Sequence, residues 1–302
     1  GATNGWIPIE DDTVTDAPLA LNSEGIFGFG NDGSVCDITN LVSNAGVVAS
    51  DVTGVGTARS TLAACEYGVD KGIVGFGYTG SNVGMTNLVS NAGVVASDVT
   101  AVGTVRRALA ACNYGGDKGI FGYGYTTTHV STSNLVTNAG VVGTDVTGVG
   151  TVREVPAACE YGGDKAIFGY GEPTTAVTNL VSNAGVVATD TTGVGTARYG
   201  IAACSYGNDK GIFGYGSTGS VVSMTNLVSN AGVVATDVTG VGTTRYYLAA
   251  CEYGGDKGIF GFGNNGGTKY GVTNLVSNTG VVGTDVSAVG TARTAIAACS
   301  FN

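Results

Sequence analysis

The chain alternates short apolar runs with polar turns, and this pattern repeats along nearly its whole length. One copy has apolar runs at residues 62–67 and 73–77, separated by a turn that contains Gly and Asp. Two more runs follow, over residues 86–95 and 98–102. Their length and their Val, Ile, Thr and aromatic content are typical of β-strands, and Gly–Asp turns are typical of hairpins. The pattern predicts four short antiparallel strands in each repeat.

The spacing of the repeats indicates the architecture. The tripeptide Asn-Leu-Val begins at Asn40, Asn87, Asn134, Asn179, Asn226 and Asn274. Successive copies are 45–48 residues apart, and periods of about 40–50 residues are typical of propeller blades. We therefore expect an all-β fold, a six-bladed β-propeller over residues 23–302.

The two ends of the repeat region complement each other. The first unit has a poor match to the innermost strand, whereas residues 295–301 supply a lone copy of it. We expect this C-terminal strand to pair with the N-terminal blade and close the ring, which removes exposed strand edges. Residues 1–22 lie outside the repeat and are expected to form an N-terminal arm or a linker.

The order of motifs resembles the kelch repeat of galactose-oxidase-like propellers. It runs from Arg-x-x-x-Ala-Ala through Ile-Phe-Gly-Phe-Gly and Asn-Leu-Val back to Arg, over residues 23–302. This resemblance implies six blades with a closing C-terminal strand. The chain departs from the kelch pattern in placing its double Gly in the first turn, as at Gly115-Gly116, and it lacks the spaced Tyr and Trp. The low-charge repeats rich in Gly, Thr, Asn and Val also resemble those of phage structural and fibre proteins.

Composition and charge exclude several partners. Charged residues make up 12% of the 302 residues, the formal net charge is −10, and Gly occurs 53 times. Eleven of the 13 basic residues occupy repeated positions: Arg59, Arg106, Arg153, Arg198, Arg245, Arg293, Lys71, Lys118, Lys165, Lys210 and Lys257. Without a basic stripe we expect no nucleic-acid partner. No apolar run approaches the ~20 residues of a membrane helix, so we expect no membrane insertion.

Six of the seven cysteines recur at one position of the repeat: Cys65, Cys112, Cys159, Cys204, Cys251 and Cys299. Equivalent positions of successive blades are too far apart for disulfides unless they converge on an axis. We expect small buried apolar side chains, because free Cys is among the most buried residue types. The alternative is a ring of thiols that lines a central channel. The seventh, Cys36, is expected to face the core.

The sequence offers little catalytic chemistry. His129 is the only histidine and lies in a Thr-rich variable loop, where we expect it to be solvated and without a partner. Copper, zinc and Ser-His-Asp sites all need His in a defined constellation. The acidic residues recur blade after blade, whereas an active site is usually one asymmetric constellation. We therefore expect no enzyme, no metal site and no cofactor.

The repeated charges suggest a structural role. An Asp and an Arg eight residues later occur in every repeat, and we expect each pair to link one blade to the next. The pairs are Asp51 and Arg59, Asp98 and Arg106, Asp145 and Arg153, Asp190 and Arg198, Asp237 and Arg245, and Asp285 and Arg293.

The variable positions are better candidates for binding, because function tends to be carried by loops on a rigid scaffold. The loops after the second strand differ between repeats, as do the residues after each repeated Arg. The candidate contact residues there are Tyr199, Tyr246, Tyr247, Tyr78, Tyr125 and Tyr270.

These observations favour a non-enzymatic structural or attachment protein, a rigid disc of a bacteriophage virion or an extracellular surface. Its expected partners are other structural proteins or surface glycans. The alternative is a lectin-like propeller that binds carbohydrate at several equivalent sites and gains avidity from them.

Overall fold

The computed structural model describes residues 23–100, 102–287 and 289–301. Eighteen strands form six separate three-stranded antiparallel sheets, here called blades. The inner strands are β3 (Ala63–Tyr67), β6 (Ala110–Tyr114), β9 (Ala157–Tyr161), β12 (Ala202–Tyr206), β15 (Ala249–Tyr253) and β18 (Ala297–Phe301). The middle strands are β1 (Glu24–Asn31), β4 (Lys71–Tyr78), β7 (Lys118–Tyr125), β10 (Lys165–Gly171), β13 (Lys210–Gly214) and β16 (Lys257–Gly261). The outer strands are β2 (Val35–Val42), β5 (Asn82–Val89), β8 (His129–Val136), β11 (Thr175–Val181), β14 (Thr225–Val228) and β17 (Thr273–Val276).

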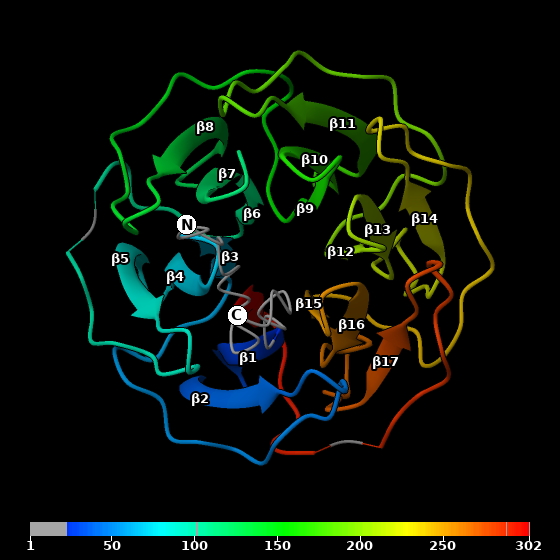
Figure 1. The fold of residues 1–302 in the computed structure, drawn as a ribbon, viewed down its shortest axis with the longest axis horizontal. Coiled ribbons are helices and arrows are strands. Elements are labelled where there is room, and N and C mark those ends of the chain that lie inside the picture. The colour runs from blue at the N-terminus through cyan, green and yellow to red at the C-terminus, as the bar shows by residue number, and fades with distance from the viewer. Residues whose placement is uncertain (1–22, 101, 288, 302) are drawn as a thin grey trace, which may run out of the picture.

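The blades surround a central axis in a propeller-like arrangement, with the inner strands nearest the axis (Figure 1). Each inner strand contacts the inner strands of both neighbouring blades, and β18 contacts β3 in the same way. β18 also pairs with β1, with Cys299 opposite Ile26, so the first and last segments of the repeat region share one sheet. The all-β prediction and the six-sheet count are confirmed. The expected arm at residues 1–22 lies outside the described residues, within which no helix could span a membrane.

The structure shows three regular strands in each blade and does not show the predicted fourth. The segment after each outer strand makes only isolated bridges with it, such as Val89 with Val95 and Thr86 with Val99. The register shifts by one residue between these two bridges. Between them the Asn87 side-chain amide donates to the Ala96 carbonyl oxygen at 2.9 Å. A side chain thus occupies part of the edge that a fourth strand would need.

The blades pack through glycines that admit neighbouring side chains. A Cβ added to Gly122 would lie 2.7 Å from the Phe168 ring of the next blade. Likewise, a Cβ on Gly119 would lie 2.6 Å from Cys65 Sγ of the preceding blade. Glycine at these places permits close approach of the sheets. The repeated cysteines are unpaired and buried, as is Cys36, in agreement with the prediction of small core side chains.

Each middle strand has a strained aromatic residue near its C-terminal end or directly after it. Phe29, Phe76, Tyr123, Tyr170, Tyr215 and Phe262 have φ between 61° and 65°. Such a conformation is unfavourable for a bulky residue and persists only where its surroundings stabilise it. In every case the ring lies under the guanidinium of the next blade's repeated Arg, at 3.9–4.5 Å from the ring centroid.

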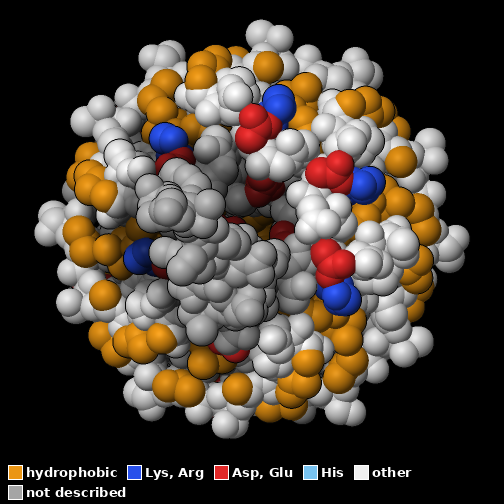
Figure 2. All heavy atoms as spheres, in the orientation of Figure 1, with side chains coloured by type: hydrophobic (Ala, Val, Ile, Leu, Met, Phe, Trp, Pro, Cys, Tyr) orange, Lys and Arg blue, Asp and Glu red, His pale blue; other side chains and the backbone are white. Residues whose placement is uncertain are grey.

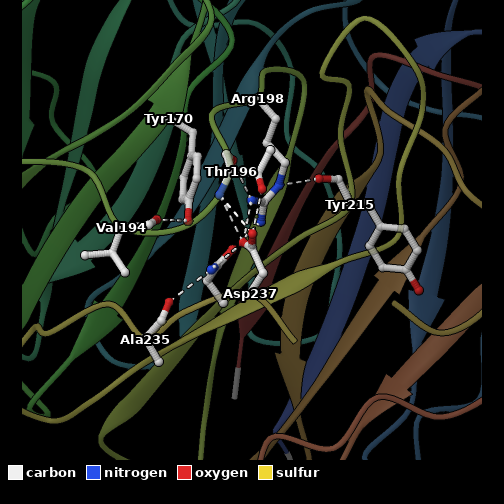
Figure 3. A network of polar contacts seen from close by, with 8 residues as sticks. Tyr170, Val194, Thr196, Arg198, Tyr215, Ala235 and Asp237 are labelled. Atoms are coloured by element: carbon white, nitrogen blue, oxygen red, sulfur yellow. Dashed lines mark hydrogen bonds and ion pairs between the residues drawn. The ribbon is translucent and has the colours of Figure 1, made fainter. Parts of the chain in front are cut away.

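Arg198 shows how this network is completed (Figure 3). Its guanidinium stacks on Tyr170 of the preceding blade and donates from Nε to the Tyr215 carbonyl oxygen at 2.8 Å. Its other nitrogens donate to the Thr196 carbonyl oxygen and to Asn226 Oδ1, at 3.0 and 2.6 Å. Burial lowers the pKa of Arg198, and the nearby Tyr170 and Asp237 oppose that shift. All six repeated arginines are fully buried.

The acidic partner of each Arg differs from the expected one. Arg198 lies 3.7 Å from Asp237, not beside Asp190, and Arg245 lies 4.0 Å from Asp285. Three further pairs of this kind are Arg59 with Asp98, Arg106 with Asp145 and Arg293 with Asp51. Asp190, near Arg153, receives the hydrogen bonds of Thr151. The Asp therefore pairs with the Arg that enters its own blade, one repeat away from the predicted partner.

Apolar side chains recur around the circumference, between polar ones. Figure 2 shows apolar side chains around the rim and paired acidic and basic side chains around a central hollow. Among the described residues, 18 valines are exposed, and all but Val69 lie in the segments that follow the outer strands. The most exposed recur once per blade: Val47, Val94, Val141, Val186, Val233 and Val281, at 61–65%. We call these segments the valine rim.

Candidate functional site: the mouth of the central channel

One mouth of the central channel is closed into a ring by backbone hydrogen bonds. The ring residues are Thr61, Ala108, Val155, Gly200, Tyr247 and Ala295, which directly precede the residue before each inner strand. Each N–H donates to the carbonyl oxygen of the equivalent residue in the preceding blade, at 2.7–3.3 Å, and Thr61 donates to Ala295. All six have φ between 46° and 61°. We call this set the mouth ring.

Below the mouth ring the channel is apolar. A cavity of about 110 Å³ is lined by the ring residues and by the aliphatic residues that follow them, among them Leu62, Pro156 and Ile201. Tyr247 is the only aromatic residue in this lining, whereas the next blade contributes Ala295 and the preceding blade Gly200. The cavity is therefore asymmetric although the backbone around it is nearly repeated.

The side chains around the mouth ring differ from blade to blade. The residue directly before each mouth-ring residue forms an isolated bridge with a residue at the end of the middle strand or shortly after that strand. These six variable pairs are Ser60–Tyr78, Arg107–Tyr125, Glu154–Glu172, Tyr199–Ser217, Tyr246–Asn264 and Thr294–Asn31. We call them together the variable face. They sit on a repeated backbone yet present aromatic, basic, acidic and neutral side chains.

Three of the predicted tyrosines come together on the variable face. The rings of Tyr199 and Tyr246 are 6.2 Å apart and nearly perpendicular, at 85°. The rings of Tyr246 and Tyr247 are 4.6 Å apart and tilted by 40°. All three are half-buried. Burial, followed by the charges of Glu154 and other neighbours including Glu172, raises the pKa of Tyr247 to about 12. The three rings therefore form a corner close to two carboxylates.

Two more predicted tyrosines, Tyr78 and Tyr125, contact one arginine on the opposite part of the face. The Arg107 guanidinium lies 4.8 Å from the ring centroids of both Tyr78 and Tyr125. Asn82 fixes this arrangement by accepting a hydrogen bond from Arg107 at 3.1 Å and donating to the Thr126 carbonyl oxygen at 2.7 Å. Each such cation–π contact contributes about 0.5–1 kcal/mol at an exposed site. This half of the face is internally satisfied.

The sixth tyrosine and the histidine lie apart from the three-ring corner. Tyr270 accepts a hydrogen bond from Asn265 at 2.8 Å and contacts none of the other five tyrosines through a ring pair. The expectation that His129 has no partner is wrong, because its Nε2 lies 3.6 Å from Glu154 Oε1 and its ring packs against Tyr125. The antiparallel pairing of β7 and β8 places His129 opposite Tyr125, which the sequence alone did not reveal.

A second feature lies deeper in the channel, at the residue that follows each repeated cysteine. Glu66, Glu160 and Glu252 occupy alternate inner strands and line the channel, with Asn113, Ser205 and Ser300 between them. We call these six residues the channel ring. The alternation of Glu with Asn or Ser was visible in the sequence, but nothing there indicated that the position faces the axis.

Burial makes the channel carboxylates weak acids. It raises the pKa of Glu66 to about 8, with smaller contributions from the charges of Glu160 and Asp70. Burial also raises the pKa of Glu252 to about 8, and the negative charges of Glu66, Glu160 and Asp256 raise it further. Burial raises the pKa of Glu160 to about 7, although a hydrogen bond from Asn113 opposes that shift. Their protonation therefore changes near neutral pH.

The repeated cysteines combine both sequence hypotheses, since they are buried between blades and also border the channel. Burial raises the pKa of Cys159 to about 12, so its reactive thiolate is scarce at neutral pH. Within residues 23–100, 102–287 and 289–301, no group of three or more His, Cys, Asp or Glu side chains is placed to hold a metal ion.

Comparison with known proteins adds no family assignment. Neither a protein-family model nor a curated protein matches this chain.

Proposed function

We propose that this chain is a non-enzymatic structural or attachment protein, a rigid disc of a virion or another extracellular surface. The observation that carries the proposal is the contrast between scaffold and face. The buried Arg network, the mouth ring and the inter-blade packing recur in all six blades. No two of the six variable pairs at the mouth carry the same two residues in the same order. A repeated scaffold that presents one variable surface suits recognition rather than catalysis.

The valine rim supports a place in a larger assembly. Monomeric proteins seldom expose contiguous apolar surface, and larger patches commonly mark protein contacts. Here the exposed valines recur in every blade around the circumference (Figure 2). Lateral contacts with other structural proteins would cover them and leave the variable face free. The repeat order and the pairing of β18 with β1 also support the inference of a kelch-like β-propeller.

Carbohydrate binding is the second candidate. The cluster of Tyr199, Tyr246 and Tyr247 beside carboxylates favours it, because sugar rings stack on aromatic faces and their hydroxyls donate to carboxylates. The cluster occurs once, since the equivalent places hold Ser60, Arg107 and Thr294. A lectin of this design would have one such site on the face rather than six equal ones.

Purified virus particles from the source of this sequence test the first candidate. Mass spectrometry should find the chain in stoichiometric amounts in the particles. Substitution of Val47, Val94 and Val141 by Ser should reduce its incorporation, whereas substitution of Tyr199 and Tyr246 by Ser should not. Absence of the chain from the particles would refute the virion role, and sugar binding at six equivalent sites on a glycan array would refute the purely structural one.

A further inference from the structure

We propose that the variable face binds a methylated ammonium group in the corner formed by Tyr199, Tyr246 and Tyr247. The inference rests on the proposed function, because it assigns a ligand class to the same face. Organic cations with methylated nitrogens are recognised by several aromatic faces together with a negative charge. The corner supplies the aromatic faces, and Tyr247 belongs to the lining of the cavity below the mouth ring. The charges of Glu154 and Glu172 act on Tyr247.

The rings provide walls in different planes. Tyr199 stands at 85° to Tyr246, and Tyr247 is tilted by 40° from Tyr246. A flat stack would offer one face, whereas walls at these angles can surround a compact, nearly spherical group. All three side chains are half-buried, so each retains some exposed surface.

Glycine makes the corner possible at this blade alone. Gly200 is the one mouth-ring residue without a side chain, and the Tyr246 ring lies directly over it. A Cβ added to Gly200 would lie 3.2 Å from Tyr246 Cδ2. The other five mouth-ring residues all carry a side chain, so Gly200 leaves the most room for the ring that packs over it.

Charge distinguishes an ammonium ligand from a neutral sugar. Glu154 and Glu172 are held together by reciprocal backbone hydrogen bonds of 2.8 Å. Their side-chain partners are His129, at 3.6 Å from Glu154, and the Thr174 hydroxyl, which donates to Glu172 at 2.8 Å. No Lys or Arg among the described residues forms an ion pair of 4.0 Å or less with either carboxylate. The negative charge near Tyr247 is therefore available to a cationic ligand.

A methylated ammonium suits this site better than a primary amine. A primary amine is strongly hydrated and needs three acceptors when water is removed, as the ammonium of Lys does. A methylated nitrogen has few or no N–H groups to satisfy and gains from contact of its methyl groups with aromatic faces. Aromatic walls with two carboxylates nearby provide the surroundings that the methylated group prefers.

Choline and its neutral carbon analogue 3,3-dimethyl-1-butanol provide the test. Titration of the whole chain, followed by calorimetry and by NMR line shifts, should show saturable binding of choline. Binding of the neutral analogue should be weaker by about tenfold, since the ring contacts remain while the charge is lost. Equal binding of the two compounds, or binding of methyl glycosides in place of choline, would overturn the proposal.

Variants locate the site. Tyr246→Ala should abolish choline binding, and Glu172→Gln should weaken it several-fold while the fold is retained. Tyr78→Ala is the matched control, because it removes a half-buried tyrosine from the opposite part of the face, and it should leave binding unchanged. Should Tyr246→Ala fail to fold, the Glu172→Gln result decides, and full binding by that variant contradicts the proposal. A particle-associated chain that ignores choline would refute this inference alone.

Discussion

Replacement of Glu66 by Gln tests whether the buried carboxylates of the channel ring destabilise the folded protein when they are charged. Glu66 lines a narrow part of the channel, and burial raises its pKa from 4.5 to about 8. A carboxyl group whose pKa is raised in the folded state binds more protons there than in the unfolded chain. Its contribution to stability is therefore complete below the unfolded pKa and is lost as the pH rises through about 8.

The shift sets the size of the effect. At about 1.4 kcal/mol for each pKa unit, a change from 4.5 to about 8 corresponds to roughly 5 kcal/mol above pH 8. Water and counter-ions at the polar mouth of the channel reduce this value, and we expect about 2 kcal/mol. Glu66→Gln should thus leave the free energy of unfolding nearly unchanged at pH 5 and raise it by about that amount at pH 9.

Urea denaturation at pH 5 and pH 9 measures the difference, because the midpoint and slope together give the free energy of unfolding. The converse experiment uses Asn113, which lies between two of the channel glutamates. Asn113→Glu should destabilise the protein at pH 9 far more than at pH 5. Asn113→Gln is the matched control, because it adds the same length without the charge. A Glu66→Gln effect of equal size at both pH values would refute the electrostatic explanation.

Three further predictions concern the packing, the Arg network and the buried cysteines. Val74 occupies the position that Phe121 has in its blade, and it borders a small cavity. In urea denaturation, Val74→Phe should therefore stabilise the fold by about 1 kcal/mol, whereas Phe121→Val should destabilise it by about 2 kcal/mol. Destabilisation by both substitutions would contradict this packing argument. Arg198→Met leaves Asn226 and Asp237 without their buried partner, and it should lower the free energy of unfolding by about 3–5 kcal/mol. Lys71→Met removes an exposed ion pair and should lower it by less than about 1 kcal/mol. Equal decreases in the two variants would argue against the network. Thiol titration of the folded chain at pH 8 should detect little reaction of the repeated cysteines, and full reaction after denaturation; rapid labelling of the native chain would show that the thiols are accessible.

The sequence was sufficient to predict the sheets because their signals are local. A period near 47 residues, β-forming residues and Gly–Asp turns are each readable within one repeat, and they gave the three regular strands of every blade. The structure does not show the expected fourth strand as a regular strand, and the reason is tertiary. The Asn87 side chain bonds to a backbone carbonyl oxygen at the place where strand pairing would continue, and no propensity scale describes such a competition.

The site was only partly predictable. Variation after each repeated Arg drew attention to Tyr199, Tyr246 and Tyr247, and the structure brings these three rings together. The partner of each Asp was assigned by nearness in sequence, whereas the blade geometry brings in an Arg from about 40 residues earlier, as for Asp237 and Arg198. The carboxylates beside Tyr247 were missed, because the bridge that unites Glu154 with Glu172 joins residues on different segments.

The Arg network also determines how such a chain can change over generations. Each repeated Arg needs an aromatic ring from the blade before it and an asparagine from the blade it enters, as Arg198 needs Tyr170 and Asn226. A deletion or duplication that ends inside a repeat would leave a buried guanidinium without one of these partners. Recombination between near-identical repeats, in contrast, adds or removes all of them together. The buried network is therefore kept intact when a whole blade is inserted or deleted, whereas the variable pairs at the mouth can be substituted one at a time.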